Sequence, residues 1–297
     1  MNLTFDSRVL IQGIVEPLGA AYTALMREYG TQIVAGVSAG HGGTSVDGVP
    51  VFDMVEQALN RAGPIDVSLI FASPYTVLDA ALEAITAEIR QIIIITEGVP
   101  PLDTIQLIRK AEATETLIVG PNSPGIIVPG KISLGTHPPQ FYTPGAVGLV
   151  SRSGTLTYEI AQALSQAGLG QSIAVGIGGD RILGSSFQQW LQILEEDEQT
   201  EVIVLVGEIG GDSEEAAAHY VAEVIDKPVI AYIAGRTAPR GQLMGHAGAI
   251  IASLAGMGAD IGTAESKLAA FKRAKIPVAD RPSQIPNLVK KAIGKKR

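Results

Sequence analysis

Short apolar runs alternate with amphipathic segments along most of this chain, and this alternation limits its fold more than any other feature. In the first half, the apolar runs typical of buried strands cover residues 9–14, 33–37, 67–71, 92–96 and 117–119. Segments with helical spacing lie between them, at residues 17–29, 51–62, 76–88 and 102–113. Near-continuous apolar strands joined by crossover helices are typical of a parallel sheet covered on both faces. The first half therefore predicts a doubly wound α/β domain.

The same alternation starts again in the second half. Its apolar runs cover residues 147–150, 173–177, 202–206 and 229–233, and its helical segments cover residues 155–167, 187–195, 213–225, 265–274 and 285–293. Between the two series, residues 121–145 are rich in Pro and Gly and show little periodicity. The length of 297 residues suffices for two domains. We predict two doubly wound α/β domains, at residues 1–124 and 146–297, with a connector at residues 125–145.

The composition excludes several functional classes. A net charge of −8 argues against a nucleic-acid or anionic-membrane partner. The absence of cysteine excludes disulfides, thiolate metal sites and a cysteine nucleophile, and we predict no metal site on this chain. No apolar run reaches membrane-spanning length, and the N-terminus has no basic and apolar leader. We therefore expect a cytoplasmic protein without a membrane partner.

Polar turns follow several of the expected strands, at the sheet edge where ligands of such folds bind. Ser153-Gly154-Thr155 joins a strand to a helix and offers hydroxyls and free N–H groups to an anion, although an ordinary helix cap would look the same. Glu208 ends another strand, where its carboxylate could orient an imidazole or simply lie near the next helix. Asn122 could bind a ligand or cap its turn.

His246 stands among small residues, in Gly245-His246-Ala247-Gly248. Small neighbours let the backbone fold closely around the ring and leave the imidazole accessible. Such an imidazole can act as ligand, proton shuttle or covalent nucleophile, and an ordinary loop histidine is the alternative interpretation. Of the other histidines, His41 lies in a glycine turn that could meet a ligand phosphate. His137 precedes two prolines, and His219 lies within a helical pattern.

Several motifs occur together in a fixed order. They are SRSGTLTYE at residues 151–159, GIGGD at 176–180, GEIGG at 207–211, AGRTAP at 234–239 and GHAGA at 245–249. In this order the motifs resemble the α subunit of succinyl-CoA synthetase (succinate–CoA ligase), and the resemblance extends over nearly the whole chain. It implies an N-terminal Rossmann-like domain that binds coenzyme A and a C-terminal flavodoxin-like ligase domain.

The resemblance also implies an activity. His246 matches a histidine that takes a phosphoryl group from succinyl phosphate and passes it to ADP or GDP, so that succinate, CoA and a nucleoside triphosphate interconvert with succinyl-CoA, the diphosphate and phosphate. A separate β subunit of the ATP-grasp type would bind the nucleotide and Mg²⁺, in an αβ or α₂β₂ assembly. Such an enzyme belongs to the tricarboxylic acid cycle.

Individual residues acquire roles in the same way. Glu208 matches the acid that holds the imidazole and fixes its tautomer. The turn Ser153-Gly154-Thr155 would open a helix whose N-terminus stabilises the phosphoryl charge. Tyr158 matches a tyrosine that contacts substrate at the subunit boundary. Asn122 and the run Ile95-Thr96-Glu97 match the walls of the CoA pocket.

The first loop departs from the family pattern. Where the family has Thr-Gly-x-Gln-Gly after the first strand, this chain reads Val15-Glu16-Pro17-Leu18-Gly19. Glu16 brings negative charge toward an anion, and Pro17 removes a backbone donor, although Pro suits a first helical turn. His41 replaces a lysine and is a weaker phosphate partner. Ser123 replaces the usual cysteine of its turn. We expect CoA to bind at this loop and at His41 through altered contacts.

Three alternatives remain at the level of sequence. An NDP-forming acyl-CoA synthetase could use another acid, such as acetate or malate. A non-catalytic CoA-binding regulator would explain the altered first loop, but the intact His246 and Glu208 argue against it. An NAD(P) dehydrogenase would need Gly-x-Gly-x-x-Gly after the first strand, and residues 13–19 do not supply it.

Overall fold

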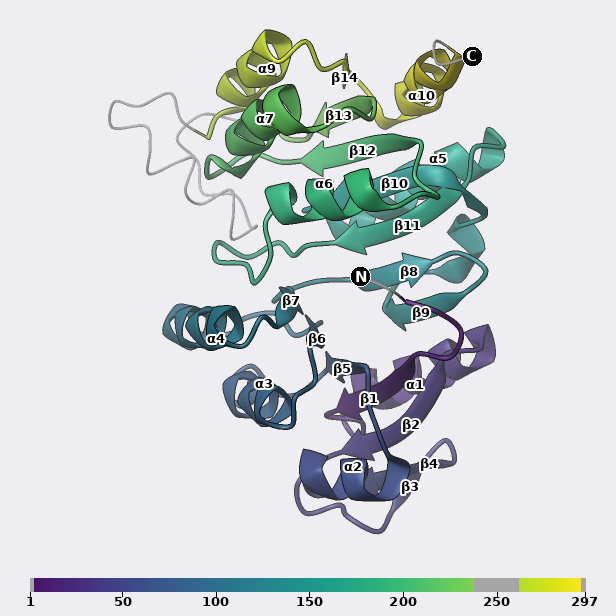
Figure 1. The fold of residues 1–297 in the computed structure, drawn as a ribbon, viewed down its shortest axis with the longest axis vertical. Helices are drawn as coiled ribbons and strands as arrows, with labels where there is room; N and C mark the ends of the chain where they lie inside the picture. The colour runs from purple at the N-terminus through teal and green to yellow at the C-terminus, as the bar shows by residue number, and fades with distance from the viewer. Residues whose placement is uncertain (1–2, 238–261, 295–297) are drawn as a thin grey trace. The chain divides into compact units, whose positions relative to one another are not determined.

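The computed structural model describes residues 3–237 and 262–294, which form two compact units (Figure 1). Unit 1 comprises Met1–Pro139 and Ile182–Ser185, and unit 2 comprises Gln140–Arg181 and Ser186–Arg297. Within the described ranges, no helix is both long enough and apolar enough to cross a bilayer. The prediction of two doubly wound α/β domains is confirmed.

Unit 1 is built on a sheet with the strand order β3-β4-β2-β1-β5-β6-β7. Its strands are β1 (Arg8–Gln12), β2 (Gln32–Val37), β3 (Ser45–Val46), β4 (Val49–Phe52), β5 (Val67–Ile70), β6 (Gln91–Ile94) and β7 (Leu117–Val119). All neighbouring pairs are parallel except β3 with β4. From β4 to β7 this is the 3-2-1-4-5-6 order of dinucleotide-binding folds, so the strand order reverses between β1 and β5.

Helices cover both faces of this sheet. They are α1 (Pro17–Tyr29), α2 (Val55–Ala62), α3 (Val77–Thr86) and α4 (Pro101–Ala113). Buried residues of α2, α3 and α4 form one apolar cluster with alternate residues of the strands, including Leu10, Ile70 and Ile92. Side chains alternate between the faces of a strand, so these helices share one face. On α1, Met26 is buried and receives a hydrogen bond from Gly135 of β9.

Two hairpins of unit 1 are absent from the sequence-based expectation. The first is β3–β4, whose turn is Asp47-Gly48 with positive φ at both residues, and helix α2 therefore begins at Val55 rather than at residue 51. The second is the antiparallel pair β8 (Gly125–Val128) and β9 (Ile132–Gly135), which lies within the stretch expected to be a connector. Both strands of this pair are fully buried, so they lack the polar alternation that marks an exposed strand.

Unit 2 has parallel strands in the order β14-β13-β12-β10-β11. They are β10 (Pro144–Ser151), β11 (Gln171–Gly176), β12 (Val202–Gly207), β13 (Val229–Ile233) and β14 (Val278–Ala279). Its helices are α5 (Gly154–Gln166), α6 (Phe187–Glu196), α7 (Ser213–Val224), α9 (Ala264–Arg273) and α10 (Ile285–Gly294). This is the flavodoxin-like order 2-1-3-4-5, with its reversal between β10 and β12.

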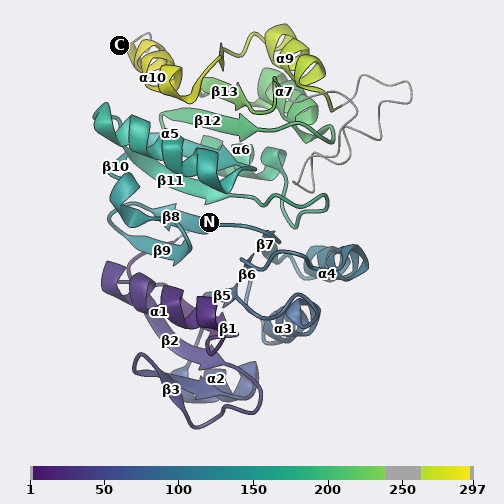
Figure 2. The same ribbon diagram turned by 180° about the vertical axis from the view of Figure 1, so that it is seen from behind.

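The helices of unit 2 also form two layers. Helices α6, α7 and α9 pack side by side on the face seen in Figure 1, and α5 packs with α10 on the face seen in Figure 2. Helix α6 begins with a capping box, in which Ser186 accepts from the Gln189 N–H and donates its own N–H to the Gln189 side chain. Its buried Phe187 and Trp190 anchor it to the sheet. Both units therefore place strand-to-helix loops at a point where the strand order reverses.

Candidate active site

In unit 1, a pocket of about 520 Å³ lies at the carboxyl ends of β1, β2 and β5. This is the reversal point of the sheet, where folds of this order bind nucleotides. Three of the predicted cofactor residues, Val15, Glu16 and His41, line it. His41 is exposed, and its Nδ1 lies 3.2 Å from the carbonyl oxygen of Ala39.

Two glycines let the first loop approach the sheet closely. Gly13 has φ +79°, and a Cβ there would lie 2.6 Å from the backbone nitrogen of Ala72. A Cβ on Gly19 would lie 2.2 Å from the carbonyl oxygen of Gly13. The absence of a side chain at both positions allows the first turn of α1 to pack closely against the loop that lines the pocket.

The pocket is acidic. Four carboxylates line it, from Glu16, Asp53, Asp79 and Glu83, and within the described part of the chain no lysine or arginine does. Asp53 accepts the N–H groups of Gly40 and Gly42 at 2.7 and 2.9 Å, and so fixes the loop that carries His41. Glu83 accepts the Val55 N–H at 2.8 Å. The shape and position fit a nucleotide, whereas the charge opposes its phosphates.

The remaining predicted residues of unit 1 lie outside this lining. Pro17 and Leu18 form the exposed first turn of α1, and Glu16 precedes them as its N-cap. Residues 95–97 follow β6, where the Thr96 hydroxyl donates to the Ala72 carbonyl at 2.7 Å. The Asn122 N–H donates to the Thr96 carbonyl at 2.9 Å. These residues form one hydrogen-bonded group beside the end of β5.

In unit 2, the corresponding reversal point lies between the loops that follow β10 and β12. The hydroxyl of Ser151 accepts the Ser153 N–H at 3.0 Å and donates to the Ser153 carbonyl at 2.9 Å, which closes a tight turn before α5. Within the described residues, the Ser153 side chain caps none of the first N–H groups of α5. Thr155 is exposed and Gly154 half-buried. The N-terminus of α5 therefore offers N–H groups and a helix dipole to an anion.

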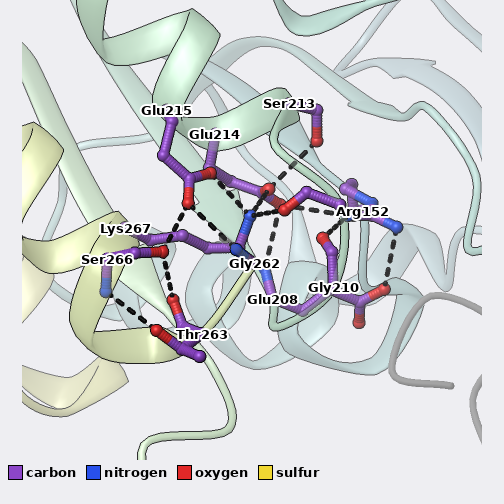
Figure 3. Close-up of polar contacts among 11 residues, drawn as sticks. Arg152, Glu208, Gly210, Ser213, Glu214, Glu215, Gly262, Thr263, Ser266 and Lys267 are labelled. Atoms are coloured by element: carbon purple, nitrogen blue, oxygen red, sulfur yellow. Dashed lines mark hydrogen bonds and ion pairs between the residues drawn. The ribbon is translucent and has the colours of Figure 1, made fainter. Parts of the chain in front are cut away.

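Glu208 directly follows β12 and is only 9% exposed (Figure 3). Its Oε1 lies 3.7 Å from Nη2 of Arg152, which follows β10. The Glu208 N–H donates to Oε1 of Glu214 at 3.1 Å, and Arg152 Nη1 contacts the same Glu214 oxygen at 3.3 Å. The ends of β10 and β12 thus form one ionic cluster.

Tyr158 lies on the first turns of α5 and is half-buried. Burial, and to a lesser degree the proximity of Tyr158, raises the pKa of Tyr142 well above its ordinary value.

His246 lies outside the described residues. His219 is on the surface of α7, where it pairs with Glu223 at 3.1 Å. His137 is buried, its Nε2 lies 3.0 Å from the Gly125 carbonyl oxygen, and burial lowers its pKa to about 4. Among residues 3–237 and 262–294, no group of three or more His, Asp and Glu side chains is placed to hold a metal ion.

Family models match both units. The CoA binding domain matches residues 4–98, and the CoA-ligase model matches residues 150–276. The chain is 48% identical to succinate–CoA ligase [ADP-forming] subunit alpha 2 of Archaeoglobus fulgidus, over 97% of this chain and 99% of that relative. It is 44% identical to the corresponding alpha subunit of Aquifex aeolicus, over 97% and 93% of the two chains. The chain belongs to the succinate–CoA ligase α-subunit family.

Solved structures support the fold. The ATP citrate lyase of Methanosaeta concilii, in complex with (3S)-citryl-CoA, superposes with a TM-score of 0.88 at 23% identity. The match covers all of this chain and 51% of that one, so the chain spans about half the length of the solved protein. This chain thus has the fold of one part of that longer chain.

Several residues of the site escape sequence reasoning. Asp53, which lies just before α2, and Glu83, which lies on α3, line the pocket of unit 1. In unit 2, Glu214 and Lys267 are buried in the ionic cluster of Glu208. Glu214 sits in the acidic first turn of a helix, which is an ordinary surface pattern. Lys267 has only the spacing of its buried helical neighbours Ala264, Ala270 and Phe271 as a signal. That spacing is the sequence signal that predicts burial of Lys267.

Proposed function

We propose that this chain is the α subunit of an ADP-forming succinate–CoA ligase, which interconverts succinate, CoA and ATP with succinyl-CoA, ADP and phosphate. The observation that carries the proposal is the 48% identity to an alpha subunit of that name over almost the full length of both chains. The buried Glu208 at the reversal point of unit 2, beside the N-terminus of α5, supports it.

In this proposal, His246 carries the phosphoryl group. A nitrogen of its neutral imidazole attacks the phosphorus of succinyl phosphate, the P–O bond to succinate breaks, and the phosphoryl group later passes from nitrogen to ADP. Glu208 accepts the other ring N–H, which fixes the tautomer and stabilises the charged ring. Ser153, Gly154 and Thr155 present the N-terminus of α5 to the phosphoryl oxygens. Tyr158 contacts the acid substrate.

CoA would bind in the pocket of unit 1. Val15, Glu16 and His41 line that pocket, and α1 directs its N-terminus toward it, with Pro17 and Leu18 in the first turn. The fit is good in position and poor in charge, because Glu16 and Asp79 would face phosphates. We place the part of the CoA site that surrounds the acyl end of the ligand near Ile95, Thr96, Glu97 and Asn122. We expect CoA to bind less tightly than in relatives whose first loop is neutral.

A β subunit of the ATP-grasp type would complete the enzyme as αβ or α₂β₂. It would bind ADP or ATP with Mg²⁺, which would neutralise the phosphate charge during transfer. We place the complex in the cytoplasm. We also place residues 1–124 in the CoA-binding domain and residues 146–297 in the ligase domain, with residues 125–145, which include the hairpin β8–β9, between them.

Phosphate transfer to His246 tests the proposal. The chain is mixed with its β subunit, Mg²⁺ and ATP labelled at the γ-phosphate, and acid-labile label is mapped to the residue. We expect label on His246 and none in His246→Asn. Label that persists in His246→Asn would refute the assignment. A panel of succinate, acetate and malate in the forward reaction separates a succinate enzyme from a synthetase for another acid.

A further inference from the structure

Three charged side chains lie buried beneath Glu208. Glu214 and Lys267 are 0% exposed and Arg152 is 6% exposed (Figure 3). Burying charges costs free energy even when they are paired, and apolar side chains of similar volume often stabilise a fold equally well. Stability alone is therefore a weak explanation for a buried ionic cluster at this place.

Glu214 uses both carboxylate oxygens. Its Oε1 accepts the Glu208 N–H at 3.1 Å and contacts Arg152 Nη1 at 3.3 Å. Its Oε2 accepts hydrogen bonds from the Lys267 ammonium at 2.5 Å and from the Ser213 hydroxyl at 3.0 Å. Gly207, the last residue of β12, makes room for it, since a Cβ there would lie 2.4 Å from Glu214 Cγ. The carboxylate thus joins the Glu208 backbone on one side to Lys267 on the other.

Lys267, on α9, is fully engaged. Its ammonium donates to Glu214 Oε2 at 2.5 Å, to Glu215 Oε2 at 2.9 Å and to the Gly211 carbonyl at 2.9 Å, which uses its three protons. Burial by itself would raise the pKa of Glu215, but the Ser266 hydroxyl and the Lys267 ammonium hold it below its ordinary value. Lys267 therefore pairs with two carboxylates, and it ties α9 to the loop that carries Glu208.

Arg152 is divided among several acceptors. Its Nη1 donates to the Gly210 carbonyl at 3.2 Å and contacts Glu214 at 3.3 Å, whereas its Nη2 lies 3.7 Å from Glu208. Glu214 holds the guanidinium closer than Glu208 does. Arg152 already lies within ion-pair distance of Glu208, and without the Glu214 charge it would approach that carboxylate more closely and compete with an imidazole for it.

From this geometry we infer that Glu214 and Lys267 are positioning residues for Glu208. Glu214 anchors the Glu208 backbone and holds Arg152 at 3.7 Å from the Glu208 carboxylate, and Lys267 fixes the Glu214 carboxylate in place. The inference rests on the proposed role of Glu208 as the acid that orients the phosphorylated histidine. It adds two residues, from α7 and α9, that act on the reaction without touching the substrate.

Substitution at residue 214 exposes this role. A glutamine side chain has one acceptor oxygen where the carboxylate has two. In Glu214→Gln, the amide NH₂ group therefore faces either the Lys267 ammonium or the Glu208 N–H, both of which are donors. The paired variant Glu214→Leu with Lys267→Met removes both charges of this pair, while Arg152 keeps Glu208 and the Gly210 carbonyl as partners and Glu215 keeps the Ser266 hydroxyl. Such exchanges are commonly neutral or stabilising. It separates the stability of the fold from the position of Glu208.

The test measures the rate of histidine phosphorylation in the assembled complex by rapid quench with labelled ATP. Each variant is made alone and together with Glu208→Gln. We expect Glu214→Gln and the paired variant to slow labelling about tenfold or more, while the KM for CoA changes less than about twofold. In the Glu208→Gln background, the same changes should cost less than about twofold further. The melting temperature of the paired variant should stay near the wild-type value.

Glu215→Gln is the matched control. Among contacts of the described residues, Glu215 reaches Lys267 and Ser266 but neither Arg152 nor Glu208, so its loss should leave the labelling rate within about twofold. Equal losses with and without Glu208, or a wild-type rate in the paired variant, would overturn the inference alone. An unlabelled wild-type complex would overturn the proposed function, and this inference with it.

Discussion

At the scale of single residues, Glu16 places a carboxylate at the N-terminus of α1, where a ligand phosphate would otherwise find a favourable dipole. Removing its charge should strengthen CoA binding. We expect Glu16→Gln to lower the Kd for CoA about two- to fivefold, measured by titration calorimetry on the assembled complex. Glu28→Gln removes the same charge from the exposed last turn of α1, and should leave the Kd unchanged. An unchanged or weaker affinity in Glu16→Gln would contradict the acidic description of the loop.

At the scale of elements, the spacing of apolar residues predicted the strands and helices that carry the site, because long amphipathic periods and buried parallel strands are local patterns. The hairpin β3–β4 was missed although its Asp47-Gly48 turn is a recognisable signal. The burial of Lys267 has only the weaker signal of its apolar helical neighbours, since a lysine enters a core only where the fold brings carboxylates to it. The predicted positions of Glu208 and Ser153 follow from the strand order, whereas the acidity of the pocket in unit 1 depends on which helix faces reach it.

Hairpin β8–β9 depends on a neutral histidine. His137 is buried next to Gly125, and its pKa of about 4 lies below the ordinary value of 6.5, which the unfolded chain recovers. The stabilisation is complete above pH 6.5 and is lost as the pH falls toward 4, because only the unfolded state takes up the proton. Between pH 7 and 5, wild type should lose about 2 kcal/mol more unfolding free energy than His137→Gln, by denaturant titration. His219→Gln, at an exposed site, should retain the wild-type slope; a parallel loss in all three proteins would contradict the assignment.

At the scale of the whole molecule, the net charge of −8 and the four carboxylates of the pocket act in the same direction on CoA, a polyanion. Raising the salt concentration from about 0.01 M to 0.15 M shortens the screening length from about 30 Å to about 8 Å, so the repulsion weakens. We therefore expect the Kd for CoA to fall about two- to threefold over this range at constant pH. Pantetheine, which carries no phosphate, should bind with the same Kd at both salt concentrations. Most phosphate sites lined by lysine and arginine show the opposite dependence, so weaker CoA binding at higher salt would show that cations dominate the site and that the carboxylates of Glu16 and Asp79 do not set its affinity.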